Sequence, residues 1–161
     1  MNIQSIIEVI KEISENPLCV YIGEGEIDEL GVTLHKGLNK ENYLERIEKF
    51  PEEYVQLLEF SNGMQFFECG DISFYSLEEV LSTQEAFGYK ENIYPIGYVL
   101  GDQVLLILDD SKQGYQIYVE AENISDDMVL LGGTFVDVME KFLLCGCNNF
   151  WYIYSDYKRK E

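Results

Sequence analysis

The sequence contains little that supports catalysis. It has one histidine, His35, no G-x-S-x-G nucleophile motif and no phosphate-binding P-loop. Gly23 and Gly25 are not followed by a third glycine at the spacing of a dinucleotide-binding turn. A triad or a histidine-based metal site would depend on His35 alone, and a lone imidazole specifies no chemistry. These absences disfavour an enzyme.

Basic residues and long apolar runs are also scarce. The 161 residues include 11 Lys and Arg against 30 Asp and Glu, which gives a net charge of −19 with neutral histidine. Such a charge repels nucleic-acid phosphates and anionic lipid headgroups, and it attracts basic proteins. No apolar run is long enough to span a bilayer, and the first residues lack a basic signal-peptide region. We therefore expect a cytoplasmic protein that binds neither nucleic acid nor membrane.

The cysteines do not form a recognisable metal motif. Cys145 and Cys147 are separated by one residue, whereas structural zinc sites pair cysteines at C-x2-C spacing. Cys19 and Cys69 stand alone. Cysteine is also among the most commonly buried residue types, so packing thiols, reduced in the cytoplasm, are the simpler interpretation. We expect no metal and no other cofactor.

Acidic residues occur in patterns that could suggest ion or hydrolytic sites. The segment from Asp109 to Glu120 has the spacing of a calcium loop, but Ser111 and Gln113 are weak ligands and both flanks are strand-like. A hairpin turn accounts for the same residues. Adjacent carboxylates such as Glu78-Glu79 do not establish a pair across a cleft, so a solvated face is the preferred interpretation.

Hydrophobic spacing predicts a mixture of helices and strands. Helices are expected at 2–15, 39–49, 51–61, 76–87 and 134–146, strands at 18–22, 64–67, 72–75, 93–100, 104–108 and 115–120, and a loop at 23–31. The segment 33–37 is ambiguous. The run 104–108 is apolar at every position, which predicts a central strand covered on both faces. The side chains expected to face inward from the helices are Ile3, Ile6, Ile7, Ile10 and Ile13 in the first, Tyr43, Leu44 and Ile47 in the second, and Phe135, Val138, Met139 and Phe142 in the last. Short connections between the strands favour an α+β fold with a mostly antiparallel sheet of about five to six strands and helices packed against it.

The helix ends carry strong local signals. In the stretch FPEEYVQLLEFSNG, Pro51 suits the first helical position, where no amide hydrogen is needed, and Asn62-Gly63 suits a helix stop. Ser76 and Glu79 have the spacing of a capping box, in which each satisfies the other's backbone amide, and Thr134 with Asp137 is expected to cap the last helix.

Charge is distributed unevenly along the chain. The segment 50–89 contains eight acidic residues and 113–140 contains six, and neither contains Lys or Arg. Aromatic residues are interleaved with them, and carboxylates around aromatic anchors suit the capture of a basic protein. The alternative is that the aromatics form the core and the acids face water. The predicted partner-binding residues are Glu68, Asp71, Glu78, Glu79, Asp109, Asp110, Tyr115, Tyr118, Glu120, Glu122, Asp126 and Asp127. No catalytic residue is predicted.

The order of these segments resembles the SUKH superfamily, which includes fungal cell-wall-synthesis regulators and many bacterial immunity proteins. The resemblance lies in FPEEYVQLLEFSNG, ISFYSLEEV, IYPIGYVLGDQVLLILD, GYQIYVE and TFVDVMEKFL, within residues 44–144. It implies a single SUKH-like α+β domain over 1–145 without enzyme activity, followed by an aromatic and then charged tail at 146–161. The longer entry GVTLHKGLNKENYLERIEKF and this tail depart from the common pattern and leave the partner open.

The function that the resemblance implies is protein binding. Bacterial members are implied to neutralise a cognate polymorphic toxin, often a nuclease or deaminase. Together with the acidic charge, this predicts an immunity protein that binds a basic toxin domain. The alternative is a non-catalytic regulatory or scaffold domain with a host-protein partner. An enzyme would need a deep pocket that holds His35 or a carboxylate pair with a shifted pKa. The oligomeric state is left open.

Overall fold

The computed structural model describes residues 1–23, 25–67, 72–99, 104–109, 116–121, 129–131 and 133–147, with the backbone alone at 20–23, 28, 104–106, 109, 116–121 and 129–130. The helices are α1 (Ile3–Glu15), a 3-10 turn η1 (Lys40–Asn42), α2 (Leu44–Ile47), α3 (Glu52–Phe60), α4 (Leu77–Phe87) and α5 (Phe135–Leu144). None of these described helices has the length and apolarity needed to cross a bilayer.

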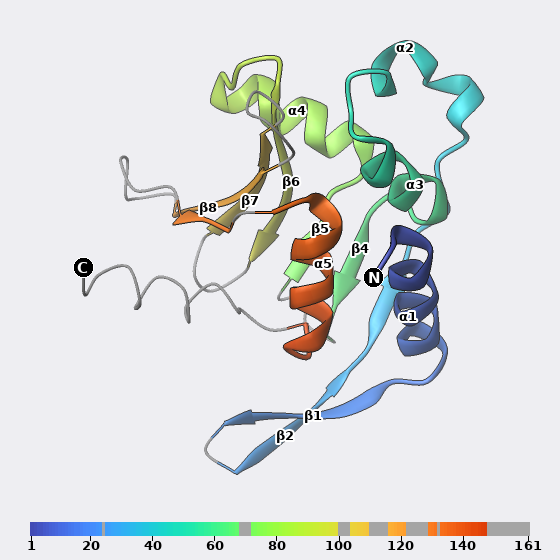
Figure 1. The fold of residues 1–161 in the computed structure, drawn as a ribbon, viewed down its shortest axis with the longest axis vertical. Helices are drawn as coiled ribbons and strands as arrows, with labels where there is room; N and C mark the ends of the chain where they lie inside the picture. Colours follow the sequence, from blue (N-terminus) through green and yellow to red (C-terminus); the bar gives the residue numbers. More distant parts are fainter. Residues whose placement is uncertain are drawn as a thin grey trace.

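The main sheet is antiparallel, and its strands follow one another in chain order (Figure 1). The strands are β3 (Val32–Leu34), β4 (Met64–Phe66), β5 (Ile72–Phe74), β6 (Ile93–Val99), β7 (Val104–Asp109), β8 (Gln116–Ala121) and β9 (Val129–Leu130). The predicted α+β class is confirmed. The sheet has seven described strands because β3, in the segment left ambiguous, and the two-residue β9 extend its edges. Two of the antiparallel connections contain helices, with η1, α2 and α3 between β3 and β4, and α4 between β5 and β6.

A separate two-stranded sheet contains β1 (Leu18–Gly23) and β2 (Glu26–Leu30). The prediction of a loop over 23–31 was therefore wrong. Acidic and glycine residues favoured a loop, but backbone pairing of Tyr21 with Ile27 and of Leu18 with Leu30 makes the segment a strand. Strand formation depends on the neighbouring strand as much as on the residue's own preference.

The predicted helix at 39–49 is broken into η1 and α2. Asn39 does cap the first turn, because its Oδ1 accepts the Glu41 N–H at 3.1 Å. Tyr43, between the two pieces, has a non-helical φ of −133°. Leu44 was expected to point inward but is 49% exposed, whereas Ile47 is buried as expected. The contact of Tyr43 with α4, described below, coincides with this interruption.

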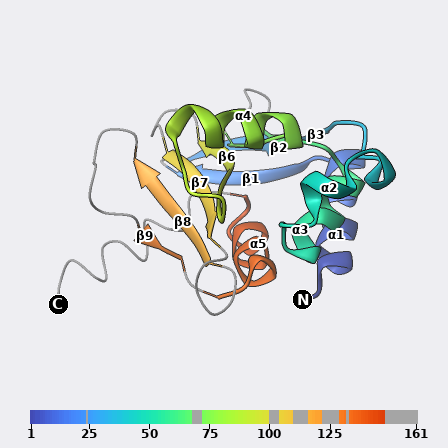
Figure 2. The ribbon, with the colours of Figure 1, turned by 90° about the horizontal axis from the view of Figure 1, so that it is seen from above.

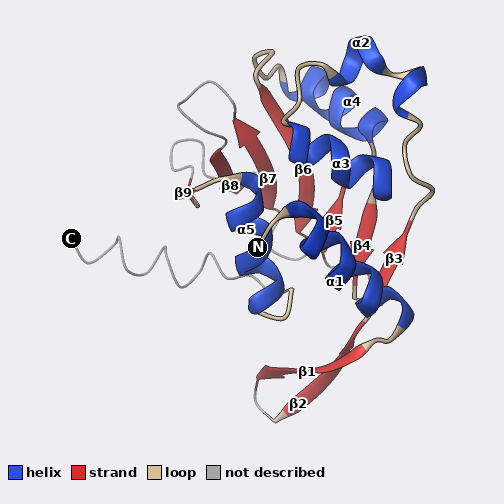
Figure 3. Cartoon of the chain, turned by 45° about the vertical axis from the view of Figure 1, so that its right-hand side comes forward, coloured by secondary structure: helices blue, strands red, loops and turns tan. Residues whose placement is uncertain are grey.

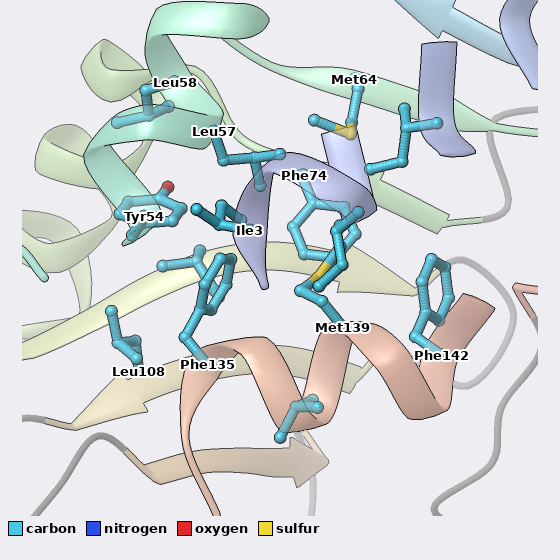
Figure 4. Packing of buried hydrophobic residues seen from close by; sticks show 14 of the residues in the cluster. Ile3, Tyr54, Leu57, Leu58, Met64, Phe74, Leu108, Phe135, Met139 and Phe142 are labelled. Carbon is cyan, nitrogen blue, oxygen red and sulfur yellow. The ribbon is translucent and has the colours of Figure 1, made fainter. Parts of the chain in front are cut away.

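The main core lies between the sheet and the layer formed by α1, α3 and α5. Figure 2 shows these three helices on one side of β6 and β7, with α4 on the other side next to β6. Figure 4 shows side chains from α1, α3 and α5 meeting those of the sheet. The largest buried side chains include Tyr54, Phe66, Ile6, Ile10 and Phe135. The predicted buried stripe of α5 is confirmed, and the Phe66 and Phe142 rings meet edge to face at 5.0 Å.

Strand β7 is covered on both faces, as its continuous apolar run predicted. Leu108 belongs to the main core, and the preceding residue, Ile107, is equally buried in a smaller cluster with Tyr75, Tyr89, Ile93 and Tyr98. Successive strand residues face opposite sides, so both sides of β7 are packed. The flanks of the calcium-like segment are indeed paired strands, β7 and β8, and its residues 110–115 lie outside the described residues.

The described cysteines only partly fit the prediction of packing thiols. Cys147 is buried, and burial raises its thiol pKa to about 12. Cys19 and Cys145 are exposed instead, and the three described thiols are free. Cys69 lies outside the described residues.

Tyr54 provides a test of the core. Its ring lies 5.5 Å from that of Phe135 in an edge-to-face contact. Its buried hydroxyl makes no hydrogen bond to any described residue, and burial raises its pKa well above the ordinary value. Because an unpaired buried hydroxyl is unfavourable, Tyr54→Phe should leave the free energy of unfolding unchanged or raise it by up to about 1 kcal/mol. Tyr54→Ala should lower it by about 3–5 kcal/mol. Urea denaturation measures both, and a clear loss in Tyr54→Phe would show that the hydroxyl has a partner.

Candidate protein-binding surface

The segment Ser61-Asn62-Gly63 joins α3, β3, β4 and α4 through side-chain hydrogen bonds. Ser61 is buried, and its hydroxyl accepts the His35 N–H at 2.9 Å. The same hydroxyl donates toward the Gly63 carbonyl at 2.6 Å, with the His35 carbonyl 3.1 Å away. His35 thus takes part through its backbone.

Asn62 connects the end of α3 to the start of α4. Its Oδ1 accepts the Leu77 N–H at 2.8 Å, and its Nδ2 donates to Glu78 Oε2 at 3.3 Å. Leu77 is the first residue of α4, where backbone amides lack partners within the helix. The sequence predicted Asn62 as part of a helix stop and did not predict this contact. We call Ser61-Asn62-Gly63 with its hydrogen-bond partners the SNG corner.

Glu79, one of the predicted partner-binding residues, belongs to the capping box of α4. Its carboxylate accepts hydrogen bonds from the Ser76 N–H at 2.7 Å and the Ser76 hydroxyl at 2.8 Å, as the spacing predicted. The carboxylate is exposed but already holds two hydrogen bonds. Its local role in capping the first turn of α4 accounts for its position.

Glu78 lies beside it at the start of α4, is exposed, and contacts Tyr43 just before α2. A hydrogen bond from its own backbone N–H holds its carboxyl pKa below the ordinary value, and Asn62 and Tyr43 contribute to the same effect. The Tyr43 hydroxyl correspondingly has a raised pKa because of its hydrogen bond to Glu78. Glu78 therefore stays charged under acidic conditions that protonate ordinary glutamates, and it presents a fixed negative charge.

Three further predicted positions lie on adjacent central strands. Asp109 ends β7, and Tyr118 and Glu120 belong to β8. In the register, Tyr118 pairs with Ile107 and Glu120 with Leu105. Strand pairing thus brings positions 109, 118 and 120 onto neighbouring strands, whereas Glu78 and Glu79 belong to α4. The remaining predicted positions lie outside the described residues: Glu68, Asp71, Asp110, Tyr115, Glu122, Asp126 and Asp127.

Several aromatic residues that interleave with the acids form the core. Tyr54, Phe66 and Phe74 are buried, which agrees with the alternative interpretation for these three. A different aromatic residue is accessible on α4, where Phe87 is 53% exposed and stacks on Tyr89 at 5.9 Å.

The structure also reveals an acidic hollow that the sequence analysis did not predict. A cavity of about 420 Å³ lies where α1, α3 and α5 begin, and its lining includes Met1 together with Glu52, Glu53 and Asp137. The Met1 ammonium forms an ion pair with Glu140 at 2.7 Å. Thr134 hydrogen-bonds to Asp137 through its backbone N–H and its hydroxyl, and these bonds lower the pKa of Asp137. Sequence spacing predicted each helix start separately, but not that starts so far apart in the chain meet.

Basic and acidic side chains together line another hollow. This cavity of about 300 Å³ lies between α2, α4 and β6, and Arg46 and Lys49 line it together with Glu45 and Glu91. Lys49 and Glu91 form an exposed ion pair at 3.8 Å. Among the residues that the structure describes, no group of three or more His, Cys, Asp or Glu side chains is placed to hold a metal ion.

The antiparallel sheet in chain order and the helices packed on it form the α+β domain that the resemblance to the SUKH superfamily implied. The chain belongs to the SMI1 / KNR4 family (SUKH-1), whose family model matches residues 40–141. The resemblance seen in the sequence is therefore confirmed. No curated protein matches the chain. The domain boundary at residue 145 stays a prediction.

Gly63 tests the importance of the SNG corner. Its φ is +96°, and an added Cβ would lie 3.1 Å from both His35 Nδ1 and the Ser76 nitrogen. Gly63→Ala should lower the free energy of unfolding by about 2–3 kcal/mol, because backbone strain and crowding combine. Gly88→Ala is the matched control: φ is +67° and nothing lies within 4 Å of the added Cβ, so about 1 kcal/mol is expected. Thermal or urea unfolding measures both losses. Equal losses of unfolding free energy in Gly63→Ala and Gly88→Ala would contradict the importance of close packing at the SNG corner.

Proposed function

We propose that this chain is an immunity protein that binds one basic toxin domain, of nuclease or deaminase type, and blocks its active site. Membership of the SMI1 / KNR4 family over residues 40–141 carries this proposal, because the resemblance to that group implies toxin neutralisation by bacterial members. The net charge of −19 supports a basic partner.

The proposed mechanism is capture of the basic side chains that a toxin uses to hold phosphates. Glu78, with its lowered pKa, offers a carboxylate that stays charged at the start of α4. The hollow lined by Glu52, Glu53 and Asp137 has room for a long basic side chain. Each desolvated pair would contribute a few kcal/mol, whereas pairs at the solvent-exposed rim contribute about 0–1 kcal/mol.

The twelve residues predicted from the sequence remain the proposed contacts. Glu78 and Glu79 are both exposed, and both carboxylates already hold hydrogen bonds within the chain, Glu79 to Ser76 and Glu78 to Asn62 and Tyr43. The positions of Asp109, Tyr118 and Glu120 on β7 and β8 favour a shared surface for these three.

The proposal assigns no reaction to the chain and places it in the cytoplasm. His35 is exposed and lines neither of the two hollows described above. In the described part of the chain its backbone has a structural role at the SNG corner.

Coexpression tests the proposed function. The toxin domain encoded beside this gene is expressed in a host that it kills, with this chain or with an unrelated acidic protein of similar charge as the control. We expect growth only with this chain, and purification of the tagged toxin should recover it in a complex. Continued killing in the presence of well-expressed chain would refute the proposal.

Salt dependence tests the electrostatic part. The rate constant for association of the purified chain with the inactivated toxin domain should fall at least about tenfold when NaCl is raised from about 50 to about 500 mM, because salt screens long-range attraction. The dissociation rate should change less. Stopped-flow fluorescence measures both rate constants. An association rate constant that does not change with salt concentration would mean that the acidic surface does not accelerate association.

A regulatory or scaffold role is the second candidate, because the same family includes cell-wall-synthesis regulators by resemblance. It predicts that deletion of the gene alters cell-wall or stress behaviour in cells that lack any toxin. The immunity proposal predicts no such effect.

A further inference from the structure

The β1–β2 hairpin extends away from the rest of the described fold. Figures 1 and 3 show it at the end of the molecule opposite α2 and α4, beyond the edge of the main sheet. It forms its own sheet, and no third strand among the described residues joins it. Two-stranded hairpins exposed to water are marginally stable, so such an arm gains stability from anything that covers it.

The base of the hairpin is firmly held. Leu30, at the end of β2, is buried in the main core. The carbonyl of the next residue, Gly31, accepts the Phe67 N–H at 2.9 Å, and the chain then enters β3 directly. On the other side, the Asn16 N–H bonds to the Glu12 carbonyl and ends α1 just before the hairpin. The arm therefore has a defined direction, which reduces the entropy lost when a partner binds.

The hairpin combines exposed apolar residues, Ile27 on β2 and Leu18 at its base, with acidic residues. Ile27 is 70% exposed and Leu18 is 49% exposed, whereas most other large apolar side chains of the described fold are at least partly buried. Residues 18–31 contain Glu24, Glu26, Asp28 and Glu29 and no Lys or Arg. Apolar residues with charged neighbours are the composition of a protein-binding patch.

The negative charge of the hairpin indicates whether its binding partner is a second copy of this chain or a different protein. Two copies would bring together two arms with four acidic residues each, on chains that each carry −19. Such repulsion disfavours self-association, whereas a basic surface would be attracted. The partner that fits this arm is therefore a basic protein with an apolar depression for Ile27.

We propose that the β1–β2 hairpin is a docking arm that recognises the basic protein partner. This inference rests on the proposed function and deepens it, because it assigns the choice of toxin to the arm. The family match covers residues 40–141 and does not include the hairpin. Discrimination among toxins would then depend on a part of the chain that the family model does not match.

Binding of the inactivated toxin domain encoded beside this gene tests the inference. Ile27→Ser removes the exposed apolar contact, and the double variant Glu26→Lys with Glu29→Lys reverses charge on β2. The control, Glu8→Lys with Glu59→Lys, makes the same change in net charge at exposed positions of α1 and α3. We expect each hairpin variant to raise the Kd at least about tenfold and the control to change it less than about threefold.

Two further measurements separate docking from other effects. Thermal unfolding tests whether each variant is folded. Amide hydrogen exchange compares the free wild-type chain with its complex, so its result is independent of whether any variant folds. The amides of β1 and β2 should exchange quickly in the free chain and at least about tenfold more slowly in the complex. Slow exchange only in the complex supports a docking arm, and unchanged exchange overturns it.

The remaining outcomes are distinct. Normal binding and rescue by both hairpin variants would overturn the proposal that the hairpin is a docking arm, and would leave the proposed immunity function intact. Equal losses in the hairpin charge variant and the control, with none in Ile27→Ser, would mean that net charge alone matters and would also overturn it. Failure of the wild-type chain to bind or rescue would overturn both proposals. A wild-type dimer that Ile27→Ser converts to a monomer would assign the arm to self-association instead.

Discussion

The arrangement of this fold depends on the hydrogen bonds of the SNG corner. Through their side-chain hydrogen bonds, Ser61 links the end of α3 to the backbone at His35 and Gly63, and Asn62 links it to the first turn of α4. Asn62 also positions Glu78, so the same contact that orders the fold fixes a charged group on its surface. Because the amide has both a donor and an acceptor, no apolar residue and no carboxylate can satisfy both partners. The scaffold and part of the candidate surface are therefore built by one side chain.

The features that the sequence predicted well are those encoded within a few residues. The capping boxes at Ser76 and Thr134 each need only a partner three positions later, and both form as the spacing predicted. The isoleucine stripe of α1 and the continuous apolar run of β7 likewise reveal which faces are buried. Burial of one periodic face is a property that a single segment specifies.

The features that were missed depend on residues far apart in the chain. Strand β2 exists because β1 pairs with it, and neither acidic content nor glycine spacing reveals that pairing. The helix at 39–49 is interrupted at Tyr43, whose hydroxyl bonds to Glu78 on a later helix. The candidate surface has the same limitation. Composition predicted the sign of its charge, but only tertiary structure shows that Glu52, Glu53 and Asp137 share a hollow.

The position of α1 also has a consequence for synthesis of the chain. This first helix buries four isoleucines and contacts α3, β3 and α5, which is the last described helix. While the ribosome is still making the sheet, the isoleucines lack their final neighbours, because α5 has not yet left the exit tunnel. The nascent chain therefore exposes this apolar stripe until α5 emerges, and such a surface suits transient binding by a chaperone.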